Sequence, residues 1–114
     1  MINYGKHFID KNDIKAVVNV LKNKALTQGK ATDLFEKKLK KYFGSKYVVA
    51  VSSGTSALNL IANCLKWKKE DIIFCSPITF AAGSNCIVNQ GAKPFFVDID
   101  LNTFNLDFNL VEKA

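Results

Sequence analysis

The 114 residues are 48% hydrophobic and 23% charged, with a formal net charge of +6. This balance is typical of one globular domain and unlike that of a disordered chain. No apolar run reaches the roughly 18–20 residues that cross a bilayer, and the first residues lack the pattern of a secretory signal, so membrane and secreted proteins are disfavoured.

The positive charge is carried by lysine alone and is concentrated in residues 1–46. All 16 basic residues are lysines, and 11 of them lie in this part of the chain against four acids. A polyanion would be attracted to it, but arginine, which suits bidentate contacts with guanine and phosphate, is absent. We interpret the lysines at 37, 38, 40 and 41 as the solvated face of a helix and expect no nucleic-acid partner.

The three cysteines (Cys64, Cys75 and Cys86) are odd in number and lie among apolar residues. They show no Cys-x-x-Cys spacing, and His7, the one histidine, is distant in sequence. A disulfide framework or a metal site is therefore not expected. We interpret all three as small buried hydrophobic residues of a cytoplasmic protein.

Residues 1–46 are expected to form an N-terminal helical segment with two amphipathic helices. The first is predicted at about residues 11–23, with Asp10 as its N-cap, because apolar residues recur at helical spacing at Ile14, Val17, Val18 and Leu21. The second is predicted at about residues 33–43, with Gly44 as its C-terminal stop and an apolar stripe of Phe35, Leu39, Tyr42 and Phe43.

Residues 47–114 alternate between strand and helix patterns. Short apolar runs predict buried strands at residues 47–51, 71–75 and 92–98. Helices are predicted between them at residues 57–66 and 79–90. The first of these is expected to turn inward Leu58, Ile61, Ala62 and Leu65; the second is expected to be capped by Thr79 and ended by Gly91. Asp107 is predicted to cap a further helix that runs to the last residue.

This order of elements predicts an α/β fold, in which N-terminal helices precede a β-α-β-α-β parallel sheet. Ligands of such sheets bind at the carboxyl ends of the strands. The two loops that follow Val51 and Cys75 are therefore the candidate binding loops.

The first candidate loop, residues 52–56, joins a predicted strand to a helix N-terminus. Free backbone N–H groups and the helix dipole favour an anion there. Gly54 permits a close approach, and Thr55 and Ser56 add hydroxyl donors. A phosphate is the expected ligand; an ordinary turn and helix cap is the alternative. Neither a P-loop nor a G-x-G-x-x-G pattern is present.

The second candidate loop, residues 76–80, ends in Phe80. Its ring offers a flat face against which a planar ligand can stack, and packing in the core is the alternative. A phosphate on one loop and an aromatic ring on the other suit a phosphorylated heteroaromatic cofactor.

Four segments in register resemble the N-terminal part of the DegT/DnrJ/EryC1/StrS sugar aminotransferases, which are fold type I enzymes that use pyridoxal 5′-phosphate (PLP). The segments are residues 27–29, 51–58, 76–80 and 91–100. The resemblance implies that residues 47–114 are the first, incomplete part of the PLP-binding large domain.

The resemblance also implies roles for single residues. The cofactor phosphate would be held by Gly54, Thr55 and Ser56, and its pyridine ring would stack on Phe80. A loop near the active site, of the same subunit or of the partner in a homodimer, would be formed by Thr27, Gln28 and Gly29. Three further positions match the family: Asn85, to which no role is assigned, and Asp98 and Asp100, which we interpret as strand-end and turn residues.

Residues 76–86 most resemble the branch of the family that acts in pseudaminic acid biosynthesis. The implied reaction transfers an amino group from glutamate to C4 of a UDP-linked 4-keto-6-deoxy-N-acetylhexosamine. Family members that act on other nucleotide sugars use the same cofactor residues, so the sugar remains open.

The resemblance places the catalytic groups downstream of the third strand. These are a lysine that holds PLP as a Schiff base and a carboxylate paired with the pyridine nitrogen; no lysine of this chain matches. We therefore expect an N-terminal part of a longer enzyme that does not transaminate by itself. The alternatives are a self-contained phosphate- or nucleotide-binding α/β domain without catalysis, with a complete sheet, and a basic nucleic-acid-associated protein whose affinity falls with salt.

Overall fold

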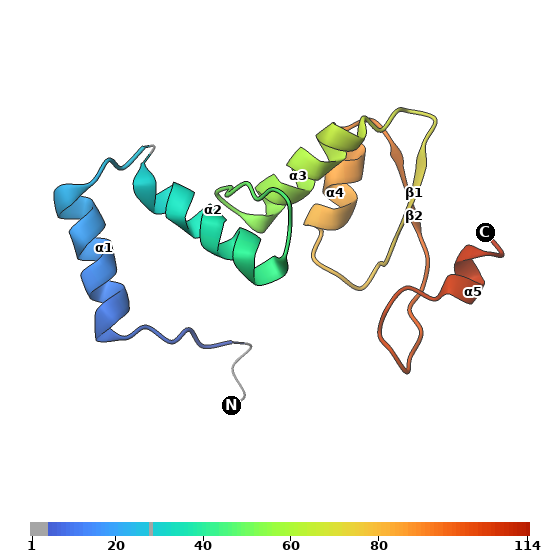
Figure 1. Cartoon of the computed structure of the whole chain (residues 1–114). Coiled ribbons are helices and arrows are strands. Elements are labelled where there is room, and N and C mark those ends of the chain that lie inside the picture. The colour runs from blue at the N-terminus through green and yellow to red at the C-terminus, as the bar shows by residue number, and fades with distance from the viewer. Residues whose placement is uncertain (1–4, 28) are drawn as a thin grey trace. The chain divides into compact units, whose positions relative to one another are not determined.

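A computed structural model describes residues 5–27 and 29–114. In chain order these residues form the elements α1 (Lys11–Asn23), α2 (Lys30–Phe43), α3 (Gly54–Leu65), β1 (Ile72–Cys75), α4 (Ala82–Asn89), β2 (Lys93–Phe96) and α5 (Phe108–Val111) (Figure 1). The chain divides into two compact units, unit 1 (Met1–Ala50) and unit 2 (Val51–Ala114). Among the described residues, no helix is both long and apolar enough to cross a membrane.

Helix α1 begins at a capping box built from two aspartates. Asp10 Oδ1 accepts hydrogen bonds from the backbone N–H groups of Asn12 and Asp13 (2.7 and 3.0 Å), and Asp13 Oδ2 accepts one from the Asp10 N–H (2.9 Å). These bonds satisfy N–H groups that the helix itself cannot. The bonds from Asp13 and Asn12 lower the pKa of the Asp10 carboxyl. The predicted bounds and cap of this helix are confirmed.

Helix α2 begins three residues before the predicted start. Its N-cap is Gly29, which has no side chain that could accept a capping bond. The Gly29 carbonyl accepts the first backbone bonds of the helix, from the N–H groups of Thr32 and Asp33, so the sequence holds no side-chain cap signal at this start. The predicted end is confirmed: Gly44 adopts a left-handed φ of 63°, a conformation that glycine takes at little cost.

Residues 47–51 were expected to form a strand, and this prediction is wrong for the described structure. No other described segment pairs with them along a ladder, and the Ala50 N–H donates to Glu36 Oε1 at 2.8 Å. A β-branched run becomes a strand only where a neighbour completes its backbone hydrogen bonds. The sheet of the described residues therefore has two strands where three were predicted.

The two strands of unit 2 pair in parallel, with Ile72 opposite Lys93 and Cys75 opposite Phe96. Because α4 connects them, the unit contains the predicted β-α-β arrangement, and the α/β fold class is confirmed. Phe74 and Phe95 face each other across the strands, with ring centroids 5.4 Å apart and planes at 75°. This edge-to-face geometry is the one that aromatic pairs prefer.

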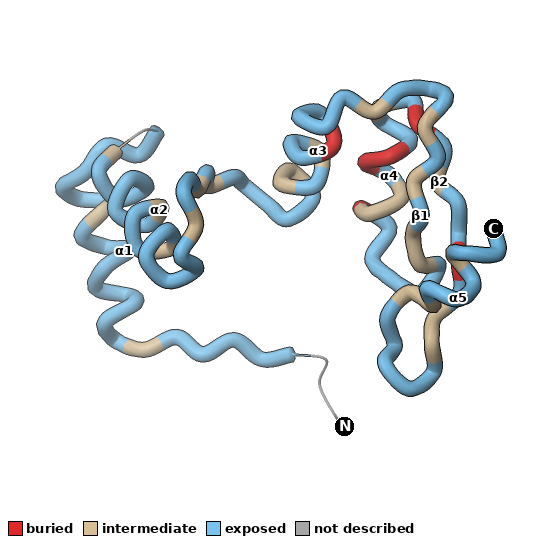
Figure 2. Tube along the Cα trace, turned by 45° about the vertical axis from the view of Figure 1, so that its right-hand side comes forward, coloured by how far each residue is buried: buried red, intermediate tan, exposed pale blue. Residues whose placement is uncertain are grey.

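A small core lies between α3 and α4 (Figure 2), and Ile73 and Cys75 of β1 pack against it. It consists of Ala62, which is fully buried, and Cys86, Ile87 and Ala92, which are at most 5% exposed. Small residues at a helix contact let the two backbones approach closely. One polar bond adds to the contact, because Asn89 Nδ2 on α4 donates to Asn59 Oδ1 on α3 at 3.1 Å.

Two predicted helix starts in unit 2 are also wrong. Helix α3 begins at Gly54 rather than at residue 57, because Ser53 caps it. Helix α4 begins at Ala82, after Ala81, and no side chain caps it. Thr79 stays outside the helix and makes no capping bond, so the loop after β1 is longer than the cap pattern suggested.

The inward face predicted for α3 is reduced to one residue. Ala62 is buried, whereas the other three expected members, Leu58, Ile61 and Leu65, are exposed. Likewise, only one of the three cysteines is the buried residue that was predicted: Cys86 is buried, Cys75 half-buried and Cys64 exposed. The described core is too small to cover these side chains.

Substitution of Asp10 by alanine is expected to destabilise α1, because the backbone N–H groups of Asn12 and Asp13 lose their acceptor. Amide hydrogen exchange of Asn12 and Asp13 should accelerate in D10A and stay unchanged in the control D33A, whose carboxylate makes no capping bond. In the wild-type protein, the protection of the Asn12 and Asp13 amides should fade below about pH 4. The pKa of the Asp10 carboxyl is lowered in the fold, so its charged form stabilises the helix at higher pH and this stabilisation is lost when the carboxyl is protonated. Unchanged exchange in D10A would contradict this account of the cap.

Candidate functional site

The N-terminus of α3 is organised by hydroxyl groups. Ser53 is the N-cap, and its Oγ accepts a hydrogen bond from the Ser56 N–H at 3.1 Å. Ser56 Oγ lies 3.0 Å from Ser53 Oγ and 3.1 Å from Ser52 Oγ. The hydroxyls of Ser52 and Ser53 thus both contact Ser56 Oγ, and we call these three residues the serine cluster.

Two backbone amides beside the serine cluster are left for an outside acceptor. The N–H groups of Gly54 and Thr55 open the helix and have no intrahelical partner, and within the described part of the chain no other group accepts from them. A Cβ built on Gly54 would meet no atom within 4 Å, so the space beside the Gly54 Cα is open at this helix start.

The electrostatics of α3 differ from those of α1 and α2. These two helices carry acids in their first turns, Asp13 and Asp33, whereas the first turn of α3 has none. The positive end of the α3 dipole is therefore not compensated by a carboxylate. Open amides, hydroxyl donors and an uncompensated dipole together favour a bound anion such as a phosphate.

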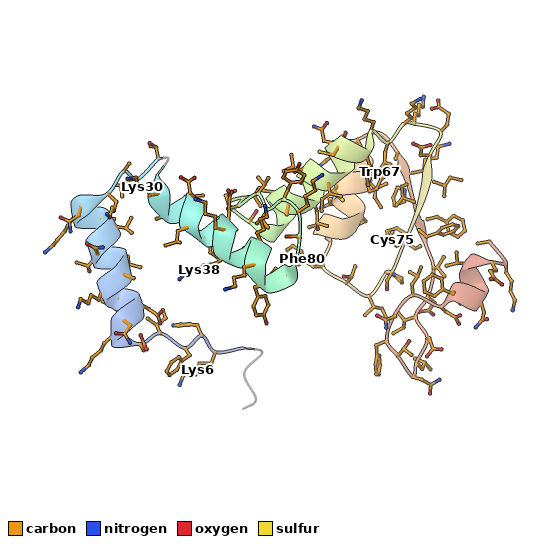
Figure 3. The ribbon with its side chains drawn as sticks, in the orientation of Figure 1. Lys6, Lys30, Lys38, Trp67, Cys75 and Phe80 are labelled. Carbon is orange, nitrogen blue, oxygen red and sulfur yellow. The ribbon has the colours of Figure 1, made fainter. Side chains whose placement is uncertain are left out.

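The loop from β1 to α4 presents Phe80. Ser76 Oγ accepts from the Ile78 N–H at 3.1 Å and shapes the start of this loop, and the Phe80 carbonyl accepts from the Gly83 N–H at 3.2 Å where α4 begins. The Phe80 side chain is 79% exposed and lies outside the described core (Figure 3). Its face is available to a planar ligand.

The structure brings some of the expected site residues together and leaves others apart. Gly54, Thr55 and Ser56 are neighbours at the α3 N-terminus, and α3 packs on α4, which follows Phe80. Among the described residues no hydrogen bond or ring contact joins Phe80 to the serine cluster. Thr27 and Gly29 belong to unit 1, and Gln28 lies outside the described residues.

The two aspartates that match the family hold the chain after β2 in a turn. Asp100 Oδ1 accepts from the N–H groups of Asn102 (2.7 Å) and Thr103 (3.0 Å), and these bonds lower the pKa of its carboxyl. The Asp98 carboxylate accepts from the Ile99 N–H. Asn85 is an exposed residue of α4. The described residues hold no group of three or more His, Cys, Asp or Glu side chains that could bind a metal ion.

The half-buried thiol of Cys75 ends β1, next to the Phe80 loop. Burial raises its pKa, and the neighbouring Cys86 adds to the effect. A thiol with a raised pKa is a poor nucleophile at neutral pH. Cys75 packs against the core that contains Cys86, and we interpret it as a structural residue.

The sequence pattern did not single out Ser52. Its hydroxyl belongs to the serine cluster, although the sequence analysis placed it only within the loop. The signal was present as two consecutive serines before Gly54, but the sequence alone does not tell which hydroxyl faces which.

Comparison with known proteins gives one family and several close relatives. Residues 7–114 match the model of the DegT/DnrJ/EryC1/StrS aminotransferase family. A UDP-4-amino-4,6-dideoxy-N-acetyl-beta-L-altrosamine transaminase from Campylobacter jejuni is 42% identical over 112 residues, which cover 98% of this chain and 29% of that protein. The chain thus spans less than a third of the length of this curated relative.

Solved structures of similar proteins share the fold. Helicobacter pylori PseC, an aminotransferase involved in the biosynthesis of pseudoaminic acid, is 38% identical with a TM-score of 0.86, covering 98% of this chain and 30% of that one. An E. coli GDP-4-keto-6-deoxy-D-mannose-3-dehydratase with bound hydrated PLP is 34% identical with a TM-score of 0.90, covering 100% of this chain and 31% of that one.

Truncation of Phe80 to alanine is expected to change the free energy of unfolding of the ligand-free protein by about 0.5 kcal/mol or less, because the ring packs on little. The control I87A removes a side chain that is 2% exposed and is expected to cost about 2–5 kcal/mol. Chemical denaturation of both variants measures the difference. A loss in F80A as large as that in I87A would mean that Phe80 is a core residue.

Proposed function

Because the chain belongs to the DegT/DnrJ/EryC1/StrS aminotransferase family, we propose that it is the N-terminal part of a PLP-dependent nucleotide-sugar aminotransferase. The complete enzyme transfers an amino group from glutamate to C4 of a UDP-linked 4-keto-6-deoxy-N-acetylhexosamine. It works as a homodimer in the cytoplasm. The isolated 114 residues are inactive, because the catalytic lysine and the carboxylate that pairs with the cofactor nitrogen lie elsewhere in the enzyme.

The exposed apolar surface of both units supports a larger protein around this chain. Long apolar side chains on α1, on α2 and in the turn before α5 are more than half exposed, among them Ile14, Leu21, Phe43, Leu101 and Phe104. In monomeric proteins, large exposed apolar patches mark surfaces that contact other parts of a protein or a partner. Further parts of the enzyme or a second subunit would cover it.

The residues of the α3 N-terminus fit the phosphate of PLP, and this fit is the single observation that carries the proposal. The open space beside the Gly54 Cα and the absence of an acid from the first turn favour a dianionic group there. The amides of Gly54 and Thr55 and the hydroxyls of Thr55 and Ser56 would donate to its oxygens.

The remaining part of the cofactor would lie against Phe80. An exposed ring on the neighbouring loop can stack on a pyridine ring and keep water from one of its faces. When bound, PLP supplies an electron sink that stabilises negative charge on the substrate carbon. The described residues thus bind and orient, while proton transfer belongs to residues outside the matched segment.

The choice of substrate rests on the relatives. The name of the Campylobacter jejuni transaminase, which is 42% identical, contains a UDP-linked sugar, and the PseC structure is that of an aminotransferase involved in the biosynthesis of pseudoaminic acid. A dehydratase that acts on a GDP-linked sugar is the second candidate, because its structure matches with a TM-score of 0.90. The matched segment therefore supports a nucleotide-sugar enzyme.

The complete protein, supplied with PLP, glutamate and a UDP-linked 4-keto-6-deoxy-N-acetylhexosamine, is expected to form a product with one amino group in place of the C4 oxygen. Mass spectrometry of the sugar nucleotide detects this exchange, and 2-oxoglutarate should appear in equal amount. The isolated 114-residue chain is the negative control. Loss of water from a GDP-linked 4-keto-6-deoxy sugar, without amino transfer to the UDP-sugar, would replace the proposal by the dehydratase alternative.

A further inference from the structure

The serine cluster holds more hydroxyl groups than a helix cap requires. Capping needs one acceptor, and Ser53 Oγ provides it to the Ser56 N–H. Ser52 Oγ makes no capping bond; its contact within the described residues is with Ser56 Oγ, at 3.1 Å. The position of Ser52 therefore calls for an explanation other than helix stability.

The protons and lone pairs of the three hydroxyls explain why Ser52 lies beside Ser56 Oγ. A serine hydroxyl has one proton to donate and two lone pairs that accept. Ser56 Oγ has two hydroxyl neighbours, Ser52 and Ser53, at 3.1 and 3.0 Å. When both neighbours donate to it, its lone pairs are occupied and its own proton remains free for a third group.

Such an arrangement also strengthens the bond that Ser56 can make. Hydrogen bonds in a chain polarise one another, so a hydroxyl that accepts two bonds becomes a better donor. The first turn of α3 contains no carboxylate that would compete for this proton, and the neighbouring amides of Gly54 and Thr55 have no acceptor among the described residues.

We propose that Ser52 and Ser53 are positioning residues that donate to Ser56 Oγ and so direct the Ser56 hydroxyl proton toward a phosphate oxygen of the cofactor. The inference rests on the proposed function, because it needs PLP as the ligand of α3. Ser56 touches the phosphate, whereas Ser52 and Ser53 act through Ser56.

Ser52 is the position that tests this idea, because Ser53 also caps the helix. Replacing Ser53 would shorten or loosen α3 and would weaken binding for that reason alone. Ser52 is exposed, so S52A removes one hydroxyl and leaves the cap in place. S52T keeps a hydroxyl at the same position and is the conservative variant.

The experiment compares the binding of PLP and of pyridoxal, which lacks the phosphate, to the complete protein and its variants. Dissociation constants are measured by absorbance titration. S52A is expected to weaken PLP binding about threefold to tenfold, the size of one neutral hydrogen bond, and to leave pyridoxal binding unchanged. S52T should restore PLP binding. The matched control is S45A in unit 1, which removes a buried hydroxyl without a partner among the described residues and should bind both ligands as wild type does.

Each result decides one of the two claims. Equal PLP affinity in S52A and wild type overturns the positioning role and leaves the proposed function intact. Equal weakening of PLP and pyridoxal also overturns it, since the loss would not depend on the phosphate. Wild-type protein that binds neither compound would refute the proposed function itself.

Discussion

The packing of α3 on α4 through small side chains is the contact on which unit 2 depends. Ala62 is fully buried against a core that includes Cys86 and Ile87, and the bond between Asn59 and Asn89 fixes the same pair of helices. A longer side chain at position 62 would force the helices apart. This contact fixes the direction of α3, and a site on the end of a packed helix is positioned more accurately than one on a loop.

Signals within a few residues of sequence predicted the helices well. The pairing of strands that are distant in sequence could not be predicted in this way. Helix α1 was predicted to its last residue, because its apolar spacing and its Asp10 cap both act within a few positions. The strand expected at residues 47–51 depends on a neighbour that the described residues do not supply. The start of α4 was misplaced because Thr79 looks like a cap, although the chain uses no side-chain cap there.

For the candidate site, the sequence indicated the residue types but not their arrangement in space. The sequence singled out Gly54, Thr55, Ser56 and Phe80 because a glycine with hydroxyls at a helix start suits a phosphate and a loop aromatic suits a flat ring. It did not show that Phe80 is exposed, nor that Ser52 faces Ser56. Segments similar to this chain occur in an aminotransferase and in a dehydratase. This is expected if the segment binds the cofactor and other segments select the reaction.

The central claim is that the α3 N-terminus holds the cofactor phosphate through the amides of Gly54 and Thr55. Amide hydrogen exchange of the complete protein, with and without PLP, tests it most directly. The account predicts that PLP slows exchange of these two amides by at least tenfold, because an open helix end gains an acceptor, while the already capped amides of Asn12 and Asp13 do not change. Protection by PLP elsewhere in the protein, with the amides of Gly54 and Thr55 unaffected, would contradict it.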